Sequence, residues 1–123
     1  MMKNIEHFAY DKEREEECMA SINQAQSILG GKWSFLVLAQ LSMRSQRFNQ
    51  MRRQLGDIST KSLTDTLRHL EQNGIISRTV FPTVPVTVEY SLTQKGREFQ
   101  AILLEMYTWG HKWGKLENKQ DRI

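Results

Sequence analysis

Three leucines at helical spacing, followed closely by a proline-containing hairpin, constrain the fold of this chain more than any other feature. Leu63, Leu67 and Leu70 place apolar side chains on one face of a helix that is predicted to begin at Ser59. Ser59 is a good N-cap, because its hydroxyl can accept a hydrogen bond from a free backbone N–H group. Gly74 suits a left-handed stop at the other end. The opposite face of this helix is polar, so the helix is expected to bury one side only.

A shorter helix precedes this one. Phe48, Met51 and Leu55 repeat at helical spacing, and a turn over residues 56–58 separates them from Ser59. Two short helices joined by such a turn are predicted to form a helix-turn-helix.

A β-hairpin follows the second helix. Residues 75–81 are rich in β-branched and aromatic side chains, and residues 86–92 alternate between apolar and polar, so both segments are predicted strands. Pro82 and Pro85 lie between them, fix φ and remove two backbone donors. The tip of the hairpin is therefore expected to project stiffly.

The rest of the chain is predicted to be helical. Helices are expected over residues 21–29, ended by Gly30 and Gly31, and over residues 32–41, which is apolar nearly all round and is therefore expected in the centre of the core. A long helix is expected over residues 94–116. The fold class is mainly α with a small β-hairpin wing, a winged helix-turn-helix. We divide the chain into a polar N-terminal arm (1–17), a winged helix-turn-helix domain with its C-terminal helix (18–116) and a polar tail (117–123). The polar, charge-dense residues 1–18 are expected to be a mobile arm or a short helix that orders on a partner.

Length and composition exclude several classes of protein. A chain of 123 residues is enough for one domain, and its single cysteine cannot build an intrachain disulfide framework or a cysteine-rich zinc module. His7, His69 and His111 are too scattered for a metal site, and we predict no metal and no cofactor. No stretch approaches the 20 or so apolar residues of a membrane span, and the N-terminus lacks the apolar core of a secretory signal. These features predict a cytoplasmic protein.

Positive charge is concentrated in the middle of the chain. Residues 43–97 carry nine arginines and lysines against four acidic residues, whereas residues 1–18 carry three basic and six acidic residues. This pattern fits a centre that faces nucleic acid, and it equally fits a solvated surface with uneven charge.

The polar face of the helix from Ser59 suits the major groove of DNA, where side chains near a helix N-terminus meet base edges. The alternative is an amphipathic helix whose outer face meets only water. The residues predicted to face bases are Ser59, Thr60, Lys61, Ser62, Thr64 and Arg68. Those predicted to hold phosphates or lie along the adjacent minor groove are Arg52, Arg78, Thr83, Val84 and Thr87.

Four segments of the chain resemble motifs of the HxlR-type winged-helix regulators. They are residues 28–33 (ILGGKW), 47–53 (RFNQMRR), 58–74 (ISTKSLTDTLRHLEQNG) and 78–93 (RTVFPTVPVTVEYSLT). Phe81 stands where the family has tyrosine, and Val86 stands where it has the second proline of the wing. The resemblance implies a homodimeric DNA-binding transcription factor on a pseudo-palindromic operator, with the terminal helices at the dimer interface.

The long C-terminal helix also favours a dimer. Its apolar seam is wide and aromatic, as surfaces that bind a partner chain tend to be. Alternatively, the seam folds back onto Trp33 and Phe35. The residues expected at the dimer interface are Ile22, Ile102, Met106, Trp109 and Trp113.

Cys18 lies where many HxlR-type proteins have a thiol that senses oxidants or electrophiles, and the resemblance implies that role here. A position just before a helix would favour the thiolate through the helix dipole, whereas Glu15, Glu16 and Glu17 oppose it. Since the chain has no second cysteine, any disulfide must join Cys18 to its dimer mate or to a small thiol. The alternative is an inert cysteine.

Two other functions compete with DNA binding. An enzyme using Cys18 as nucleophile lacks a histidine base, a glycine-rich loop and a carboxylate pair, so we predict no catalytic activity. A winged-helix protein-interaction module, or a ligand-responsive regulator in which Cys18 is structural, is the remaining alternative.

Overall fold

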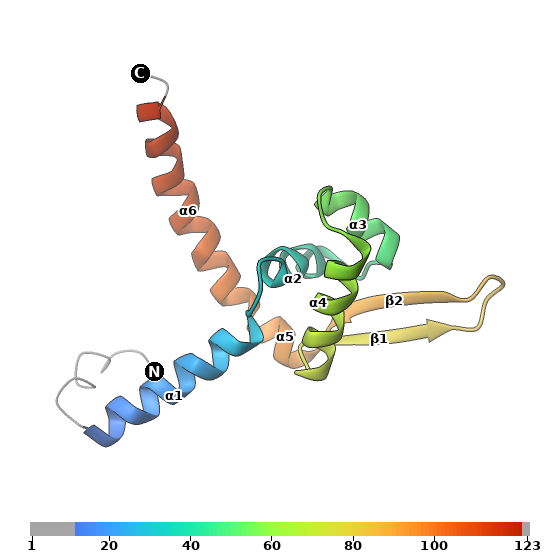
Figure 1. Ribbon diagram of the computed structural model, residues 1–123, viewed down its shortest axis with the longest axis horizontal. Coiled ribbons are helices and arrows are strands. Elements are labelled where there is room, and N and C mark those ends of the chain that lie inside the picture. Colours follow the sequence, from blue (N-terminus) through green and yellow to red (C-terminus); the bar gives the residue numbers. More distant parts are fainter. Residues whose placement is uncertain (1–11, 122–123) are drawn as a thin grey trace. The chain divides into compact units, whose positions relative to one another are not determined.

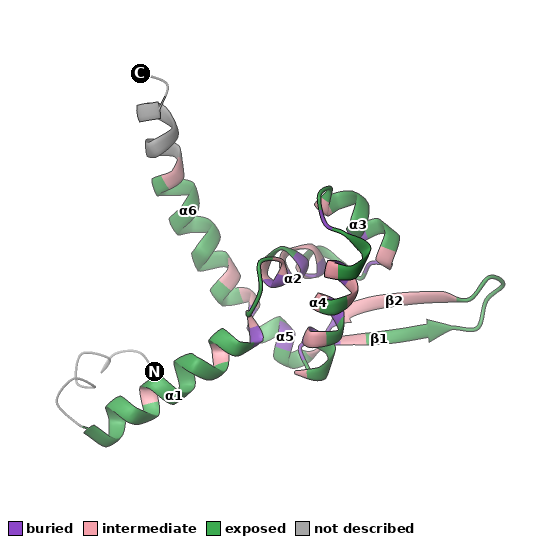
Figure 2. Ribbon diagram, in the orientation of Figure 1, coloured by how far each residue is buried: buried purple, intermediate pink, exposed green. Residues whose placement is uncertain are grey.

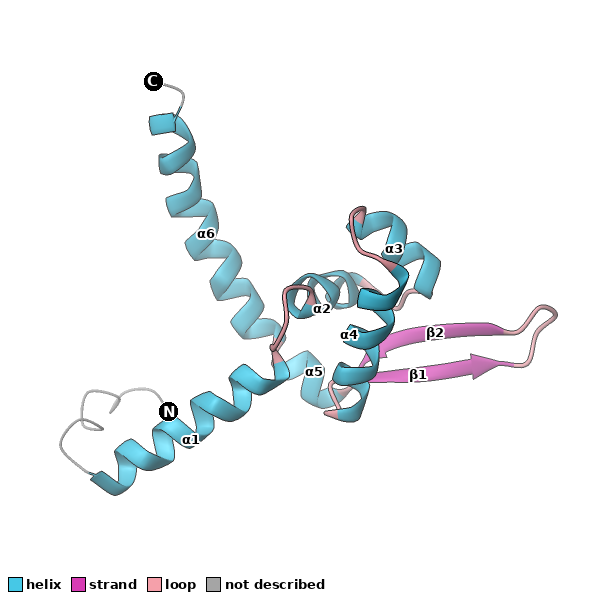
Figure 3. Ribbon diagram, viewed as in Figure 1, coloured by secondary structure: helices cyan, strands magenta, loops and turns pink. Residues whose placement is uncertain are grey.

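The computed structural model describes residues 12–121, with side chains as far as residue 114, and the chain divides into two compact units. The first unit, which ends at Gly31, contains helix α1 (Lys12–Ile28). The elements of the second unit follow in chain order (Figures 1 and 3). They are α2 (Ser34–Met43), α3 (Phe48–Leu55), α4 (Thr60–Gln72), β1 (Ile76–Phe81), β2 (Thr87–Leu92), α5 (Gln94–Glu98) and α6 (Gln100–Asp121).

Helix α1 begins earlier than the sequence predicts. The prediction placed its start at Ser21, where apolar periodicity begins, but the helix starts at Lys12. The cause is intrinsic propensity, because lysine, arginine and glutamate are good helix formers without any apolar stripe. Residues 12–17, assigned above to a polar arm, are therefore helical, whereas residues 1–11 lie outside the described part of the chain.

Helices α2, α3 and α4 surround the core of the second unit. The buried residues, whose stretches of ribbon are purple in Figure 2, come from one face of each helix. They are Val37, Leu38 and Leu41 of α2, Met51 of α3, and Leu63, Leu67 and Leu70 of α4. The predicted leucine stripe is thus confirmed. The prediction for α2 was wrong in part, because Leu36 is 46% exposed: the neighbouring helices cover only one side of α2.

Both ends of α4 are closed as the sequence predicts. The Ser59 hydroxyl accepts a hydrogen bond from the Ser62 N–H group at 3.0 Å. At the other end Gly74 has φ +73°, its N–H donates to Glu71, and the Ile75 N–H donates to Leu70. This is a Schellman motif, which requires a residue that tolerates the left-handed region.

The two strands form an antiparallel hairpin, the wing, in which Ile76 pairs with Leu92 and Phe81 with Thr87. A third segment joins its base, where Gln46 and Tyr90 exchange both backbone hydrogen bonds (3.0 and 2.8 Å). Because Gln46 lies only two residues before α3 begins at Phe48, this bridge fixes the start of α3 beside β2.

The predicted long C-terminal helix is broken into α5 and α6 at Phe99. The Phe99 N–H donates to the Gly96 carbonyl at 3.0 Å, a tight turn, and the phenyl ring is buried. Helix α6 runs to Asp121 and so takes in the start of the predicted tail, of which residues 122–123 lie outside the described chain.

Candidate nucleic-acid interface

The face of α4 opposite its leucines carries a stripe of three charged residues. Lys61, Asp65 and Arg68 follow each other at spacings of four and three, which places them on one side of the helix. All three are exposed. The Lys61 Nζ atom lies 2.8 Å from Asp65 Oδ2, with the two side chains 85% and 53% exposed. We name these three residues the outward stripe.

Both cations of the outward stripe stabilise the ionised form of Asp65. The hydrogen bond from Lys61, together with the charges of Lys61 and Arg68, lowers the pKa of the Asp65 carboxyl below its ordinary value. Asp65 is therefore ionised at neutral pH, and the stripe carries two positive charges and one negative charge.

The hydroxyl residues predicted to meet bases differ in availability. Thr60 is exposed, whereas Ser62 and Thr64 are half-buried. Ser59 is exposed but its hydroxyl is engaged in the cap of α4. Thr60, Lys61 and Arg68 are thus the predicted base-facing side chains that solvent reaches most freely.

Besides the predicted Arg52, two arginines that were not predicted to contact DNA flank α3, namely Arg47 at its N-cap and Arg53 in its last turn. A groove of about 480 Å³ runs between the start of α3 and the start of β2, and Arg47 and Arg53 line it together with residues 85–88. A neighbouring hollow of about 260 Å³ is lined by Arg52 and Arg53. Among the described side chains none of these arginines forms an ion pair. The sequence could have indicated these arginines, because all three fall at outward positions in or beside one short amphipathic helix.

The wing is held in shape by its own hydrogen bonds and carries no charge near its tip. The Thr83 hydroxyl donates to the Pro85 carbonyl at 2.8 Å and lies 2.9 Å from the Thr87 hydroxyl. Val84 is fully exposed. Residues 79–88 contain no charged side chain, and the nearest cation on the wing is Arg78, exposed on β1.

Cys18 does not lie at a helix N-terminus, contrary to the expectation from sequence. It is the seventh residue of α1, nearly two turns from Lys12, and the favourable effect of a helix dipole falls off within the first turn. Its thiol is free and half-buried. Any activation of this thiol must therefore come from neighbouring side chains.

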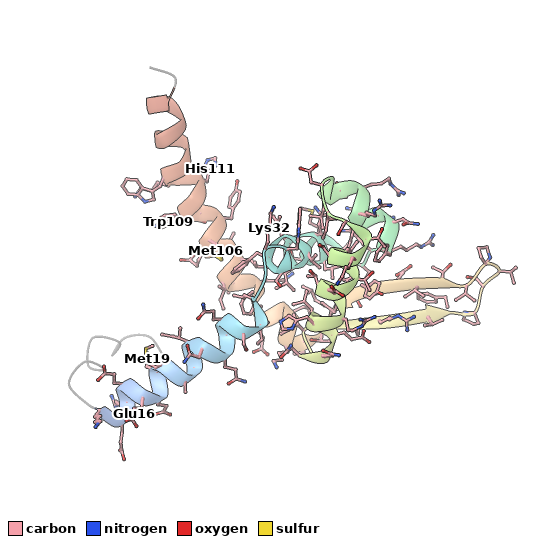
Figure 4. The ribbon with its side chains drawn as sticks, viewed as in Figure 1. Glu16, Met19, Lys32, Met106, Trp109 and His111 are labelled. Atoms are coloured by element: carbon pink, nitrogen blue, oxygen red, sulfur yellow. The ribbon has the colours of Figure 1, made fainter. Side chains whose placement is uncertain are left out.

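The residues predicted at a dimer interface are all exposed in the single chain. On α6 they are Ile102, Met106, Trp109 and Trp113, with Trp109 68% exposed, and Ile22 is exposed on α1. Figure 4 shows Met106 and Trp109 projecting from α6. The first turn of α6 contacts α2 through a hydrogen bond from the Gln100 amide to the Ser42 carbonyl at 3.3 Å. The start of α6 therefore packs against the core, whereas the aromatic seam beyond it is exposed to solvent.

A helix-turn-helix whose second helix shows an exposed polar face, followed by a stiff hairpin, defines a winged-helix regulator. The chain belongs to the HxlR-like helix-turn-helix family, whose model matches residues 28–118. In the described residues, none of the helices has the length and apolar character needed to cross a membrane.

Similar proteins share this class. An HTH-type transcriptional regulator of Methanothermobacter thermautotrophicus is 39% identical over 107 residues, which cover 87% of this chain and 82% of the relative. A second such regulator, from Synechocystis, is 39% identical over 96% of this chain and 91% of its own. The solved structure of the redox regulator HypR in its oxidized form is 38% identical, with a TM-score of 0.72 over 75% of this chain and 95% of that one. The protein is accordingly a transcriptional regulator and not an enzyme.

Proposed function

We propose that the protein is a homodimeric, sequence-specific DNA-binding regulator that works in the cytoplasm and reads its operator with α4. The observation that carries this proposal is the outward stripe, since Lys61 and Arg68 stand free of the core on the helix that follows the turn. Helices in this position place side chains on base edges in the major groove.

Phosphate binding is assigned to α3 and the base of the wing. Arg47, Arg52 and Arg53 surround the two hollows beside α3, and Arg78 lies on β1. Phosphate contacts supply affinity and position the protein, whereas base contacts supply specificity. The uncharged tip of the wing, with Thr83, Val84 and Thr87, is proposed to lie along the minor groove. It would contact the groove through van der Waals contacts and hydrogen bonds.

The dimer is proposed to form through the aromatic seam of α6, with Ile22 of α1 contributing. Exposed tryptophan and methionine side chains at helical spacing fit the apolar centre of an interface between chains. A twofold dimer binds two half-sites about 34–36 Å apart, so the operator is expected to be pseudo-palindromic.

The test of DNA reading is the double variant Lys61→Ala/Arg68→Ala. It is expected to lose capture of the duplexes that the native protein selects from a random library, while its thermal unfolding stays close to native because both side chains are exposed. The matched control is Lys12→Ala/Lys32→Ala, which removes the same charge from two exposed residues outside α3, α4 and the wing. Retained selective binding by the first variant at fixed salt would refute the placement of α4 in the groove.

Cys18 is proposed as the sensor of oxidants or electrophiles. The support is a free, half-buried thiol and the similarity of the chain to HypR and to the transcriptional regulator YodB of B. subtilis, whose reduced form is 39% identical with a TM-score of 0.67. A quinone would add to the thiolate and form one carbon–sulfur bond. Peroxide would join two Cys18 thiols as a disulfide between chains, or one to a small thiol, with release of water.

The switch is tested by treating native protein and Cys18→Ser with p-benzoquinone and measuring affinity for the selected duplex. The native protein is expected to gain the mass of the adduct and to lose affinity, and the variant to do neither. Equal responses of the two proteins would make Cys18 structural and favour regulation by a ligand bound elsewhere.

A further inference from the structure

The central residue of the outward stripe is an acid, which is an unusual choice for a surface that must approach phosphates. Asp65 has Lys61 four residues before it and Arg68 three residues after it, so it lies between the two cations. A carboxylate at this position is repelled by the DNA backbone, and a hydrogen bond that it accepts from a base offsets this repulsion. Among the bases, cytosine offers Asp and Glu such a donor in its N4 amino group.

The spacing between the Lys61 ammonium and the Asp65 carboxylate matches the spacing of two atoms on the major-groove edge of a base pair. Lys61 Nζ, a donor, lies 2.8 Å from Asp65 Oδ2, an acceptor. In the major groove a G·C pair presents the complement, because guanine O6 is an acceptor and cytosine N4 is a donor. These two atoms share a Watson–Crick hydrogen bond and so lie about 2.9 Å apart. Donor and acceptor on the helix thus face acceptor and donor on the base pair at the same spacing.

An A·T pair suits the same two groups less well. It also has an acceptor, thymine O4, beside a donor, adenine N6. Adenine adds N7, an acceptor, next to N6, where it repels the carboxylate, and thymine adds its methyl group next to O4. Guanine instead adds N7 beside O6, which gives the Lys61 ammonium a second acceptor, and cytosine has no acceptor beside N4.

We propose that Asp65 is a specificity-determining residue that, together with Lys61, selects a G·C pair at one position of each half-site. The Asp65 carboxylate accepts from cytosine N4 while Lys61 donates to guanine O6 and N7. This inference rests on the proposed function, since it needs α4 in the major groove. The carboxyl of Asp65 is exposed and is ionised at neutral pH, and Lys61 and Arg68 lower its pKa further.

The charge of the pair has a second consequence. Lys61 and Asp65 neutralise each other, so the outward stripe contributes a net charge of only +1 to the general attraction for DNA. Removing the carboxylate frees Lys61 for phosphates and raises the affinity for duplexes of any sequence. Asp65 therefore selects both for one base pair and against unrelated DNA.

The experiment is selection from a random duplex library by the full-length native protein, Asp65→Asn, Asp65→Ala and the control Glu71→Gln. The control removes one exposed carboxylate from the last turn of the same helix, three residues beyond Arg68 and outside the pair that Asp65 forms with Lys61. Far-UV circular dichroism and thermal unfolding establish that each variant is folded. Binding of labelled duplexes that differ at the single G·C pair is then measured by fluorescence anisotropy.

The native protein and Glu71→Gln are expected to enrich the same motif and to prefer G·C at the Asp65 position by roughly 5- to 150-fold. Asp65→Asn is expected to keep the rest of the motif and to change this position to A·T, since asparagine pairs with adenine N6 and N7. Asp65→Ala is expected to lose the preference and to bind unrelated duplexes more tightly. If both variants enrich the native motif, the role of Asp65 is refuted. If the native protein itself enriches no motif, the proposed function fails instead.

Discussion

The salt dependence of DNA binding provides a quantitative test of the arginines around α3. The perturbation is the double variant Arg47→Gln/Arg53→Gln, in which glutamine keeps polarity and helix propensity but removes both charges from the groove beside β2. Each phosphate contact contributes about 0.9 to the slope of log K against log salt. A dimer carries four such arginines, so the slope is expected to fall by about 3.6.

This slope difference is large enough to measure directly. Over a fourfold rise in potassium chloride, four contacts at about 0.9 each predict that native affinity drops roughly 150-fold more than that of the variant. The assay is fluorescence anisotropy with the selected duplex at several salt concentrations, and Lys12→Gln/Lys32→Gln is the control of equal charge. An unchanged slope would show that the groove beside α3 does not face DNA. A changed base preference at an unchanged slope would assign Arg47 and Arg53 to base reading.

Three further predictions concern the fold and the dimer. Gly96→Ala is expected to lower the free energy of unfolding by about 1–3 kcal/mol, because the added methyl group would collide with the Ile75 carbonyl oxygen. Urea unfolding measures this, and an unchanged midpoint would contradict it. Ser59→Ala removes the cap of α4 and is expected to cost about 1 kcal/mol in the same assay, whereas native stability would mean that the cap is replaced by water. Trp109→Glu places a charge in the aromatic seam and is expected to make the protein monomeric in sedimentation velocity; a persistent dimer would move the interface away from α6.

Local rules predicted most of the second unit. Periodicity identified the leucine stripe of α4, a hydroxyl and a glycine at fixed positions identified its ends, and the prolines identified the hairpin tip. These features depend on residues a few positions apart, so no long-range information is needed to find them. The same reasoning found the outward face of α4, including Lys61 and Arg68.

Other parts of the interface depend on distant segments. The groove beside α3 exists because Gln46 pairs with Tyr90, which brings Arg47 and Arg53 beside the start of β2. The tight turn at Phe99 occurs where its ring is buried, and the close approach of Gly96 to Ile75 joins two segments 21 residues apart. Periodicity along the C-terminal segment predicts one continuous helix and does not locate this turn.

The sequence by itself determined the kinds of element, the buried side of α4 and the family, because spacing and turn chemistry are local properties. Tertiary structure decided which arginines share a groove with the wing. It also brought Gly96 against the Ile75 carbonyl. These outcomes required three-dimensional placement, since they depend on which strand a loop joins and on which distant segments pack together.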